Sequence, residues 1–94
     1  MMKIEHEEYK KKGSFFIDEN GERLAKLEYF FSAPGKITIY HTEISEKFRG
    51  EGIGRDLVAA AVDYARKKGL KIIPKCPYAK RVIDSIPEFQ DVLA

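Results

Sequence analysis

Hydrophobic and polar residues alternate over the first half of the chain and recur with a helical period over the second half. Three stretches rich in β-branched and aromatic residues predict strands: 13–17, 22–31 and 36–44. The segments between them, 18–21 and 32–35, contain Asn-Gly and Pro-Gly pairs that are typical of tight turns. The first half is therefore expected to form an antiparallel meander.

The second half begins with a helix pattern. Apolar residues recur at helical spacing, at Ile53, Leu57, Val58, Ala61, Val62 and Ala65. Gly69 suits the C-terminal cap, and residues 70–73 are typical of a buried fourth strand. A helix between two strands favours a parallel crossover, and residues 77–86 predict a second helix with one more helical turn over 88–93. The predicted order is β-β-β-α-β-α, an α/β (α+β) fold in which an antiparallel meander leads into a βαβ unit.

Length and composition predict one soluble globular domain over residues 1–94. Residues 1–12 end in a charged run, and we expect them to be partly mobile with His6 as a solvated side chain. No apolar stretch reaches the roughly 18 residues of a membrane helix, and the N-terminus lacks a signal-peptide pattern. A cytoplasmic protein without membrane contact is expected. The single cysteine, Cys76, excludes an internal disulfide and a multi-cysteine zinc site, so no metal is expected.

Charge is unevenly placed along the chain. Residues 47–81 carry ten basic and three acidic side chains, whereas acidic residues predominate on both sides of this segment. Such a field favours a small polyanionic ligand or a nucleic-acid backbone. The segment contains few aromatic residues on which bases could stack (Phe48, Tyr64 and Tyr78), which makes nucleic acid the less favoured partner.

The segment Phe48-Arg49-Gly50-Glu51-Gly52-Ile53-Gly54-Arg55 lies between the third strand and the first helix. Its three glycines allow a sharp turn with space for a ligand, and the helix start points unpaired N–H groups at that space. This arrangement predicts a pyrophosphate site, with Arg49 and Arg55 flanking it. A plain connecting turn is the alternative. The segment lacks the Gly-Lys-Ser/Thr of a P-loop and the third glycine of a Rossmann pattern.

The stretch from Arg49 to Gly54 instead resembles the Arg/Gln-x-x-Gly-x-Gly/Ala motif of the GNAT superfamily of acyl-CoA N-acyltransferases, and the resemblance extends over residues 38–83. It implies acetyl-CoA as cosubstrate. The amides from Gly50 to Arg55 would bind its pyrophosphate. The strand end at Ile44 and Ser45 would bind the pantetheine arm, and the acyl group would lie where two strands splay apart. Lys80 and Arg81 are candidates for the adenosine 3′-phosphate.

The chain also departs from the usual pattern of that superfamily. It is shorter than a usual member, and we expect it to lack the N-terminal strand-and-helices region that normally walls the acceptor site; Glu46 stands where many members have proline. Members often carry Asn-x-x-Ala-x-x-x-Tyr after the fourth strand, with the Tyr protonating the departing CoA thiolate. Here Cys76 stands near the Asn position, Ala79 matches, and Ile83 occupies the Tyr position.

This combination is similar to a miniature subgroup that pairs a strand His with a Cys after the next strand, here His41 and Cys76. Cys76 precedes Pro77 at a predicted helix start, where a thiolate is favoured. Each residue also has a structural interpretation, Cys76 as a small buried hydrophobe and His41 as a packed or surface residue. Tyr78 either donates a proton to the thiolate or packs in the core.

These observations predict an acetyl-CoA-dependent N-acetyltransferase with an amine acceptor, either a protein amine or a small polyamine. In one route His41 removes the proton of an amine that attacks the thioester directly. In the other, Cys76 takes the acetyl group first. Two other classes stay open: a non-enzymatic CoA or acyl-CoA sensor, and a nucleic-acid-binding module. The oligomeric state is not predicted.

Overall fold

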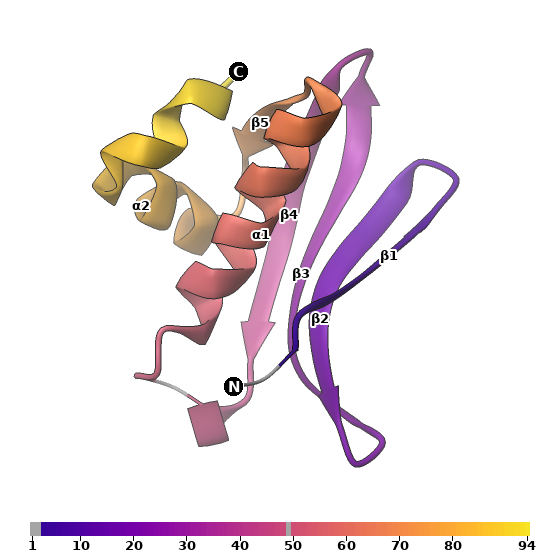
Figure 1. The fold of residues 1–94 in the computed structure, drawn as a ribbon, viewed down its shortest axis with the longest axis vertical. Coiled ribbons are helices and arrows are strands. Elements are labelled where there is room, and N and C mark those ends of the chain that lie inside the picture. Colours follow the sequence, from indigo (N-terminus) through magenta and orange to yellow (C-terminus); the bar gives the residue numbers. More distant parts are fainter. Residues whose placement is uncertain (1–2, 49) are drawn as a thin grey trace.

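A computed structural model describes residues 3–48 and 50–94. The fold is built on one five-stranded sheet in the order β1-β2-β3-β4-β5 (Figure 1). The first four strands are antiparallel to their neighbours, and β5 runs parallel to β4. The strands are β1 (Glu5–Tyr9), β2 (Lys12–Glu19), β3 (Glu22–Ala33), β4 (Lys36–Ile44) and β5 (Lys71–Pro74).

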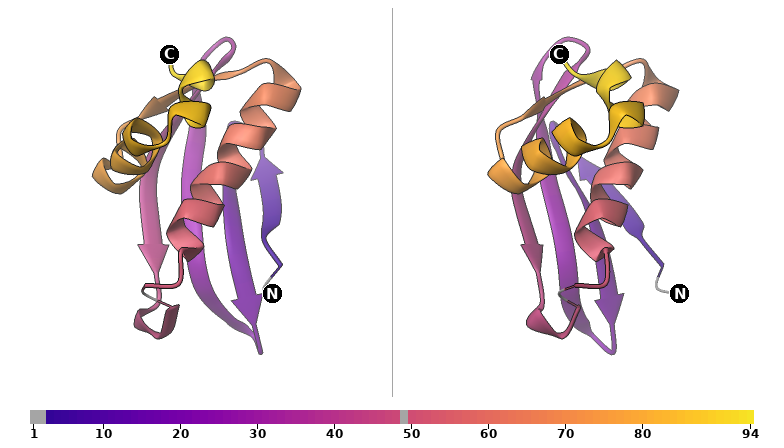
Figure 2. Two further views of the ribbon diagram at one scale, coloured as in Figure 1. Left: turned by 60° about the vertical axis from the view of Figure 1, so that its left-hand side comes forward. Right: turned by 90° about the vertical axis from the view of Figure 1, so that its left-hand side faces the viewer.

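The two described helices, α1 (Ile53–Lys68) and α2 (Pro77–Ser85), lie on the same face of this sheet (Figure 2). Short 3₁₀ turns precede α1 and follow α2, at η1 (Glu46–Phe48) and η2 (Pro87–Val92). None of the helices in the described part of the chain is long and apolar enough to span a membrane. The predicted α/β (α+β) architecture, a meander followed by a βαβ unit, is confirmed.

The core forms where the apolar stripe of α1 packs on the covered face of the sheet. Leu57 and Val58 of the helix are fully buried there with Leu27 and Ile39 of the strands. Each such side chain stabilises the fold by about 1.5–3 kcal/mol. The helix ends at Gly69, which adopts a left-handed conformation as the sequence predicts. This short, tightly packed crossover holds the start of α1 beside the end of β4.

Sequence analysis missed β1, so the meander has four strands rather than three. The segment Glu5–Tyr9 is exposed throughout and shows no alternation of apolar and polar residues. Its hairpin to β2 turns at Lys10, which has φ 58° and is neither Gly nor Asn, so the usual turn signal is absent. The strand pairs with β2 from Glu5↔Phe16 to Tyr9↔Lys12.

The expectation that His6 is a solvated side chain is wrong. The His6 ring stacks on Phe15, with ring centroids 4.1 Å apart, and its Nε2 lies 2.6 Å from the Tyr29 hydroxyl. Tyr29 and Tyr64 each donate a 2.6 Å hydrogen bond to Glu8 Oε1. Because the Tyr29 proton goes to Glu8, the His6 contact requires His6 Nε2–H to donate to the Tyr29 oxygen. These contacts fasten β1 to β3 and α1.

The same contacts shift the pKa values in this cluster. Burial raises the pKa of Tyr29 far above its usual value, and its hydrogen bond to Glu8 adds to the effect. Burial lowers the pKa of His6, although the nearby Glu8 opposes this. For Glu8, burial acts to raise the pKa, but the hydrogen bonds from Tyr29 and Tyr64 outweigh it and leave the pKa below the ordinary value.

Candidate functional site

The two parallel strands of the βαβ unit separate partway along β4. Their pairing runs from Lys36↔Lys71 to Ile39↔Pro74 and stops there, whereas β4 continues to Ile44. The amides of Lys75 and Cys76 both donate to the carbonyl oxygen of Ile39, each at 3.0 Å, as the chain leaves the sheet. Residues 40–44 therefore have no neighbouring strand on this edge among the described residues.

The unpaired edge of β4 presents backbone groups to the gap. Successive residues of an antiparallel strand direct their backbone groups to opposite edges. The amide of Ser45 donates to the carbonyl of Leu24 at 2.7 Å, on the β3 side. Ile44 and Thr42 therefore direct theirs to the open edge. Of the two residues expected to bind a pantetheine arm, only Ile44 has this orientation. The Ser45 hydroxyl accepts a hydrogen bond from the amide of Lys47 at 3.3 Å.

The glycine turn places the start of α1 beside the same gap. Gly50 and Gly52 have φ values of 85° and 76°, which side chains of L-residues disfavour. No side chain caps the helix, and its first backbone bond runs from the amide of Asp56 to the carbonyl of Gly52. Within the described residues, the amides from Gly52 to Arg55 donate no hydrogen bond to the protein, whereas that of Glu51 donates to Phe48 at 3.3 Å. Four of the six predicted pyrophosphate amides, those from Gly52 to Arg55, thus have no acceptor among the described residues.

The gap and the helix start form one cleft of about 350 Å³. Its lining comprises Thr42, Ile44, Phe48, Gly50, Gly52, Ile53, Gly54 and Tyr78. Gly54 is required here because a Cβ at this position would overlap the side chains of Tyr78 and Ile44. Thr42 and Phe48 were not predicted from the sequence. Thr42 follows a strand irregularity, and Phe48 belongs to a 3₁₀ turn that carries no periodic signal.

Cys76 lies beside this cleft, at the residue preceding α2. It is buried, and its Sγ lies 3.4 Å from the hydroxyl of Thr42, which lines the cleft. Pro77 occupies the first turn of α2 as the sequence predicts, and this turn also places Tyr78 in the cleft. Ile83, at the position where the superfamily motif often has Tyr, is fully buried in the core.

His41 lies on the opposite face of the sheet from Cys76. Tyr40 is an extra residue in β4, because the register with β3 passes from Tyr29↔Ile39 to Glu28↔His41. The exposed His41 ring faces away from the helices, and its Nε2 lies 3.4 Å from Glu43 Oε1. The structure therefore does not bring the two residues of the predicted pair into contact.

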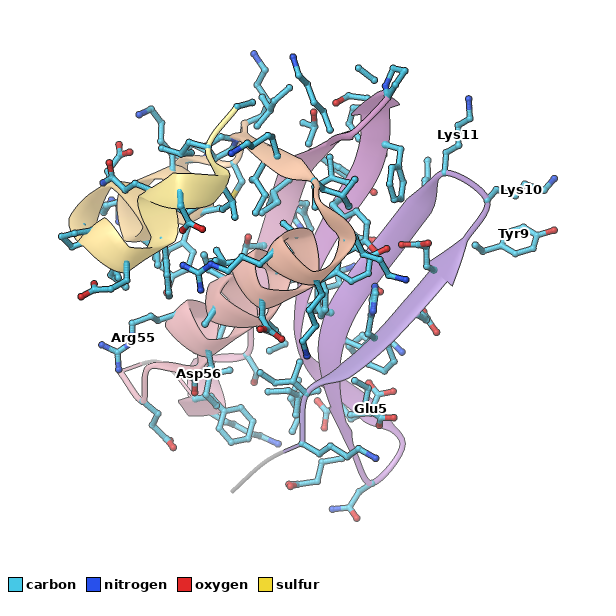
Figure 3. All side chains as sticks on the ribbon, turned by 45° about the horizontal axis from the view of Figure 1, so that its top comes forward. Glu5, Tyr9, Lys10, Lys11, Arg55 and Asp56 are labelled. Carbon is cyan, nitrogen blue, oxygen red and sulfur yellow. The ribbon has the colours of Figure 1, made fainter. Side chains whose placement is uncertain are left out.

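The predicted phosphate-binding cations lie in the first turn of α1 and in the middle of α2. Arg55 projects away from the first turn of α1 beside the glycine turn (Figure 3). Lys80 is paired with Asp84 at 2.8 Å on the surface of α2. The neighbouring Arg81 is exposed and forms no salt bridge within the described residues. Arg49, the remaining predicted residue, falls outside the part of the chain that the structure describes.

Comparison with known proteins identifies the class to which this fold and cleft belong. The sequence profile of GCN5-related N-acetyl-transferases matches residues 14–92. The chain belongs to this family, and the GNAT-like fold expected from the sequence is confirmed.

Among individual relatives, Protein NATD1 from Danio rerio is 31% identical over 90 residues, covering 95% of this chain and 80% of that protein. Protein NATD1 from Xenopus tropicalis is 30% identical over 87 residues, covering 92% and 78%. The solution structure of a GCN5-like protein from Staphylococcus aureus is 35% identical, with a TM-score of 0.76, and covers all of this chain and 91% of that one.

A more distantly related structure shares this fold over only part of its own length. The ribosomal-protein-S18-alanine N-acetyltransferase from Escherichia coli has a TM-score of 0.68 at 17% identity. It matches 83% of this chain but only 53% of its own length. At this identity the likeness concerns the fold alone.

Proposed function

We propose that this protein is an acetyl-CoA-dependent N-acetyltransferase whose cosubstrate binds in the cleft between the open edge of β4 and the start of α1. The observation that carries the proposal is that strand-edge groups and helix amides without a partner among the described residues line one cavity. A pantetheine arm contains amide groups that can pair with a strand edge. A pyrophosphate accepts hydrogen bonds from helix N-terminal amides and is favoured by the helix dipole.

The residues present fit such a ligand in chemistry and in space. The amides from Gly52 to Arg55 would hold the pyrophosphate, and the backbone groups of Thr42 and Ile44 would hold the pantetheine arm. The absence of a side chain at Gly54 keeps the cleft open at the point where Tyr78 packs. The exposed cations of Arg55 and Arg81 would attract the phosphates of the adenosine end.

Two routes for the acetyl group fit the geometry. In direct transfer, an amine nitrogen attacks the thioester carbonyl from the open face, His41 removes the amine proton, and CoA leaves as thiolate. The hydroxyl of Tyr78 is the cleft group available to return a proton to that thiolate. In covalent transfer, the Cys76 sulfur forms a new thioester, CoA leaves with the thiol proton, and the amine then takes the acetyl group.

Ligand-induced stabilisation tests the cofactor assignment. Acetyl-CoA and CoA should raise the melting temperature of the whole chain in a concentration-dependent manner, because a ligand that binds only the native state stabilises it by mass action. Dephospho-CoA should raise the melting temperature by a smaller amount if Arg55 or Arg81 contacts the 3′-phosphate. An unchanged melting temperature at millimolar acetyl-CoA would refute the proposal.

Intact mass measurement separates the two routes. After incubation with acetyl-CoA and no acceptor, covalent transfer adds one acetyl group to the native protein and none to Cys76→Ala. Direct transfer leaves both masses unchanged, and it predicts that His41→Gln loses amine acetylation while Cys76→Ala retains it. Retained CoA-induced stabilisation in both variants shows that the cofactor site is intact.

A CoA-binding sensor without turnover is the second candidate. The position of His41 and Cys76 on opposite faces of the sheet favours it, because neither residue is needed to hold the cofactor. A sensor would bind CoA and acetyl-CoA in the cleft and release no CoA from acetyl-CoA with any amine. Release of CoA that depends on an added amine would exclude this candidate.

A further inference from the structure

The uncovered face of the sheet carries a row of polar side chains that crosses four strands. Glu7 of β1 pairs with Ser14 of β2, Ser14 with Glu28 of β3, and Glu28 with His41 of β4. Directly paired residues point to the same face, and neighbouring strands lie about 4.8 Å apart. Glu7 and Glu28 are therefore separated by roughly 10 Å, with His41 one strand further on.

Ser14 is an unusual member of this row. Its side chain is 7% exposed, and its hydroxyl has no hydrogen-bond partner among the described residues. It lines a groove of about 550 Å³ on the uncovered face, together with Glu7, Tyr9, Glu28 and Tyr40. No buried side-chain oxygen or nitrogen among the described residues lacks a partner, so the Ser14 hydroxyl opens onto the groove rather than being sealed from it. It is free to exchange a hydrogen bond with a polar occupant of the groove.

Two tyrosines stand at the sides of this groove. Tyr9 is 76% exposed and Tyr40 is 40% exposed, and they are the exposed large hydrophobic residues of the described chain. Tyr9 projects from the end of β1 next to the hairpin (Figure 3). The ammonium of Lys10 lies 5.4 Å from the centroid of the Tyr9 ring, so this ring already attracts a cation. The tyrosines offer aromatic faces to alkyl chains and to ammonium groups.

Two basic side chains lie within salt-bridge distance of the carboxylates of this row. Arg23 lies 3.6 Å from Glu7, and Lys26 lies 3.7 Å from Glu28 and from Glu43. These pairs are partly exposed, and such pairs contribute little to stability and exchange easily. Lys12 also lines the groove, on the neighbouring row. The row carries two carboxylates, and a ligand with two positive charges could replace Arg23 and Lys26 as their partners.

We propose that the row Glu7–Ser14–Glu28–His41 binds a linear alkyl polyamine as the acetyl acceptor. One ammonium group binds Glu7 and a second lies near Glu28, with the hydroxyl of Ser14 accepting a hydrogen bond between them. The amine that reaches His41 lies next to Thr42, whose backbone belongs to the open edge of the cofactor cleft. The acceptor role depends on the proposed function, whereas binding of the amine to this face does not.

An alkyl polyamine suits this surface better than a lysine-bearing peptide. The groove runs across the strands and is bounded by side chains, so the amide groups of a peptide would find no sheet edge there with which to pair. A polyamine has no amide groups to satisfy. Its methylene chain can lie against Tyr9 and Tyr40 while its charges face the carboxylates.

The test is titration of the whole native chain with spermidine, 1,4-diaminobutane and butylamine, without CoA, followed by amide NMR. Shifts should concentrate at Ser14, Glu28 and His41, and spermidine should bind more tightly than butylamine. Glu28→Gln should weaken all three amines roughly fivefold, as expected for a partly exposed ion pair. Glu7→Gln should weaken spermidine by a similar factor and leave butylamine unchanged, because only the longer ligand reaches it. Glu22→Gln, which removes an acid outside the groove, is the matched control.

Equal affinity for spermidine and butylamine would overturn the proposal, as would spermidine affinity that is unchanged in Glu28→Gln. Tighter binding of a lysine-containing peptide than of spermidine would overturn the choice of occupant. Acetyl-CoA is then added, and acetylated spermidine is measured by mass. Spermidine binding without CoA-induced stabilisation would refute the proposed function and support the amine site alone. CoA-induced stabilisation without spermidine binding would refute only this inference.

Discussion

The ring of Tyr78 packs directly on the backbone of Gly54, at the first turn of α1. A Cβ at Gly54 would lie 2.6 Å from Cζ of Tyr78 and 2.6 Å from Cδ1 of Ile44. Gly54→Ala should therefore displace Tyr78, destabilise the protein by about 1–3 kcal/mol through overpacking, and reduce the stabilisation by CoA. Chemical denaturation with and without ligand measures both effects.

A second substitution provides the control for this prediction. In a Tyr78→Leu background, Gly54→Ala should cost less, because the overlapping ring atoms are gone and only the flexible end of Ile44 still has to move. Ala also favours a helix more than Gly does. An equal cost in both backgrounds would contradict the packing explanation.

Thr42 should influence the reactivity of Cys76. Its hydroxyl lies 3.4 Å from the sulfur and can donate a hydrogen bond to the thiolate. Thr42→Val keeps the shape and removes this donor, so alkylation of Cys76 by iodoacetamide should slow by roughly tenfold, the effect of one hydrogen bond to a charged group. Thr42→Ser retains the hydroxyl and should react like the native protein. A similar rate in Thr42→Val would show that the hydroxyl has no such role.

The hydroxyl of Tyr29 should stabilise the attachment of β1 to the rest of the fold. It donates to Glu8 and accepts from His6, and the Tyr29 side chain is fully buried. Tyr29→Phe leaves the His6 donor without this acceptor and should reduce the free energy of unfolding by about 1–3 kcal/mol. Tyr64→Phe removes a hydrogen bond at a more exposed position and should cost less. Urea denaturation of the two variants gives the comparison, and the reverse order would contradict this account.

The Glu8–His6 cluster predicts a loss of stability on acidification. The pKa of Glu8 is lowered in the folded protein, so its contribution is complete above its unfolded pKa and is lost as the pH falls through the lowered folded value. The pKa of His6 is also lowered, chiefly by burial, so the folded state binds fewer protons than the unfolded state as the pH falls below about 6.5. Both shifts act in the same direction.

Unfolding free energies measured from pH 7 to pH 3 test this prediction. The double variant His6→Gln/Glu8→Gln should show a shallower decline than the native protein. Substituting Glu19 with Gln, on the opposite end of β2, provides a control that leaves the cluster intact. A native-like slope in the double variant would show that other groups set the pH dependence.

Gly52 should resist substitution for a different reason from Gly54. Its φ of 76° is left-handed, whereas a Cβ would meet only the flexible end of Arg55, at 3.6 Å. Gly52→Ala should cost about 1–2 kcal/mol from backbone strain, and Gly52→Asn should cost less because Asn tolerates this conformation better. Thermal unfolding compares the two, and equal losses would argue against the backbone explanation.

Most of the helices and strands could be predicted because the turn residues, the spacing of apolar residues and the helix cap indicate the same elements. The Asn20-Gly21 pair, the helical spacing from Ile53 to Ala65 and the cap at Gly69 each indicate an element that the structure contains. Strand β1 could not be predicted, because its stability comes from partners distant in sequence. His6 and Glu8 are fixed by Tyr29 and Tyr64, and no local pattern links them.

The site was predicted less completely than the fold. The glycine turn could be found because the backbone conformation itself requires glycine at Gly50 and Gly52. The faces occupied by His41 and Thr42 depend on the extra residue at Tyr40, which reverses the alternation expected for an uninterrupted strand. That irregularity leaves no mark in the residue pattern, and the separation of His41 from Cys76 could not be foreseen.

The open edge of β4 affects the tendency of the protein to aggregate in the cell. Exposed strand edges invite pairing with other chains, and aggregation often begins at them. A bound pantetheine arm would occupy this edge and act as a removable sixth strand. The amount of soluble protein would then depend on the concentration of CoA and acetyl-CoA, and the protein without ligand would be the more prone to self-association.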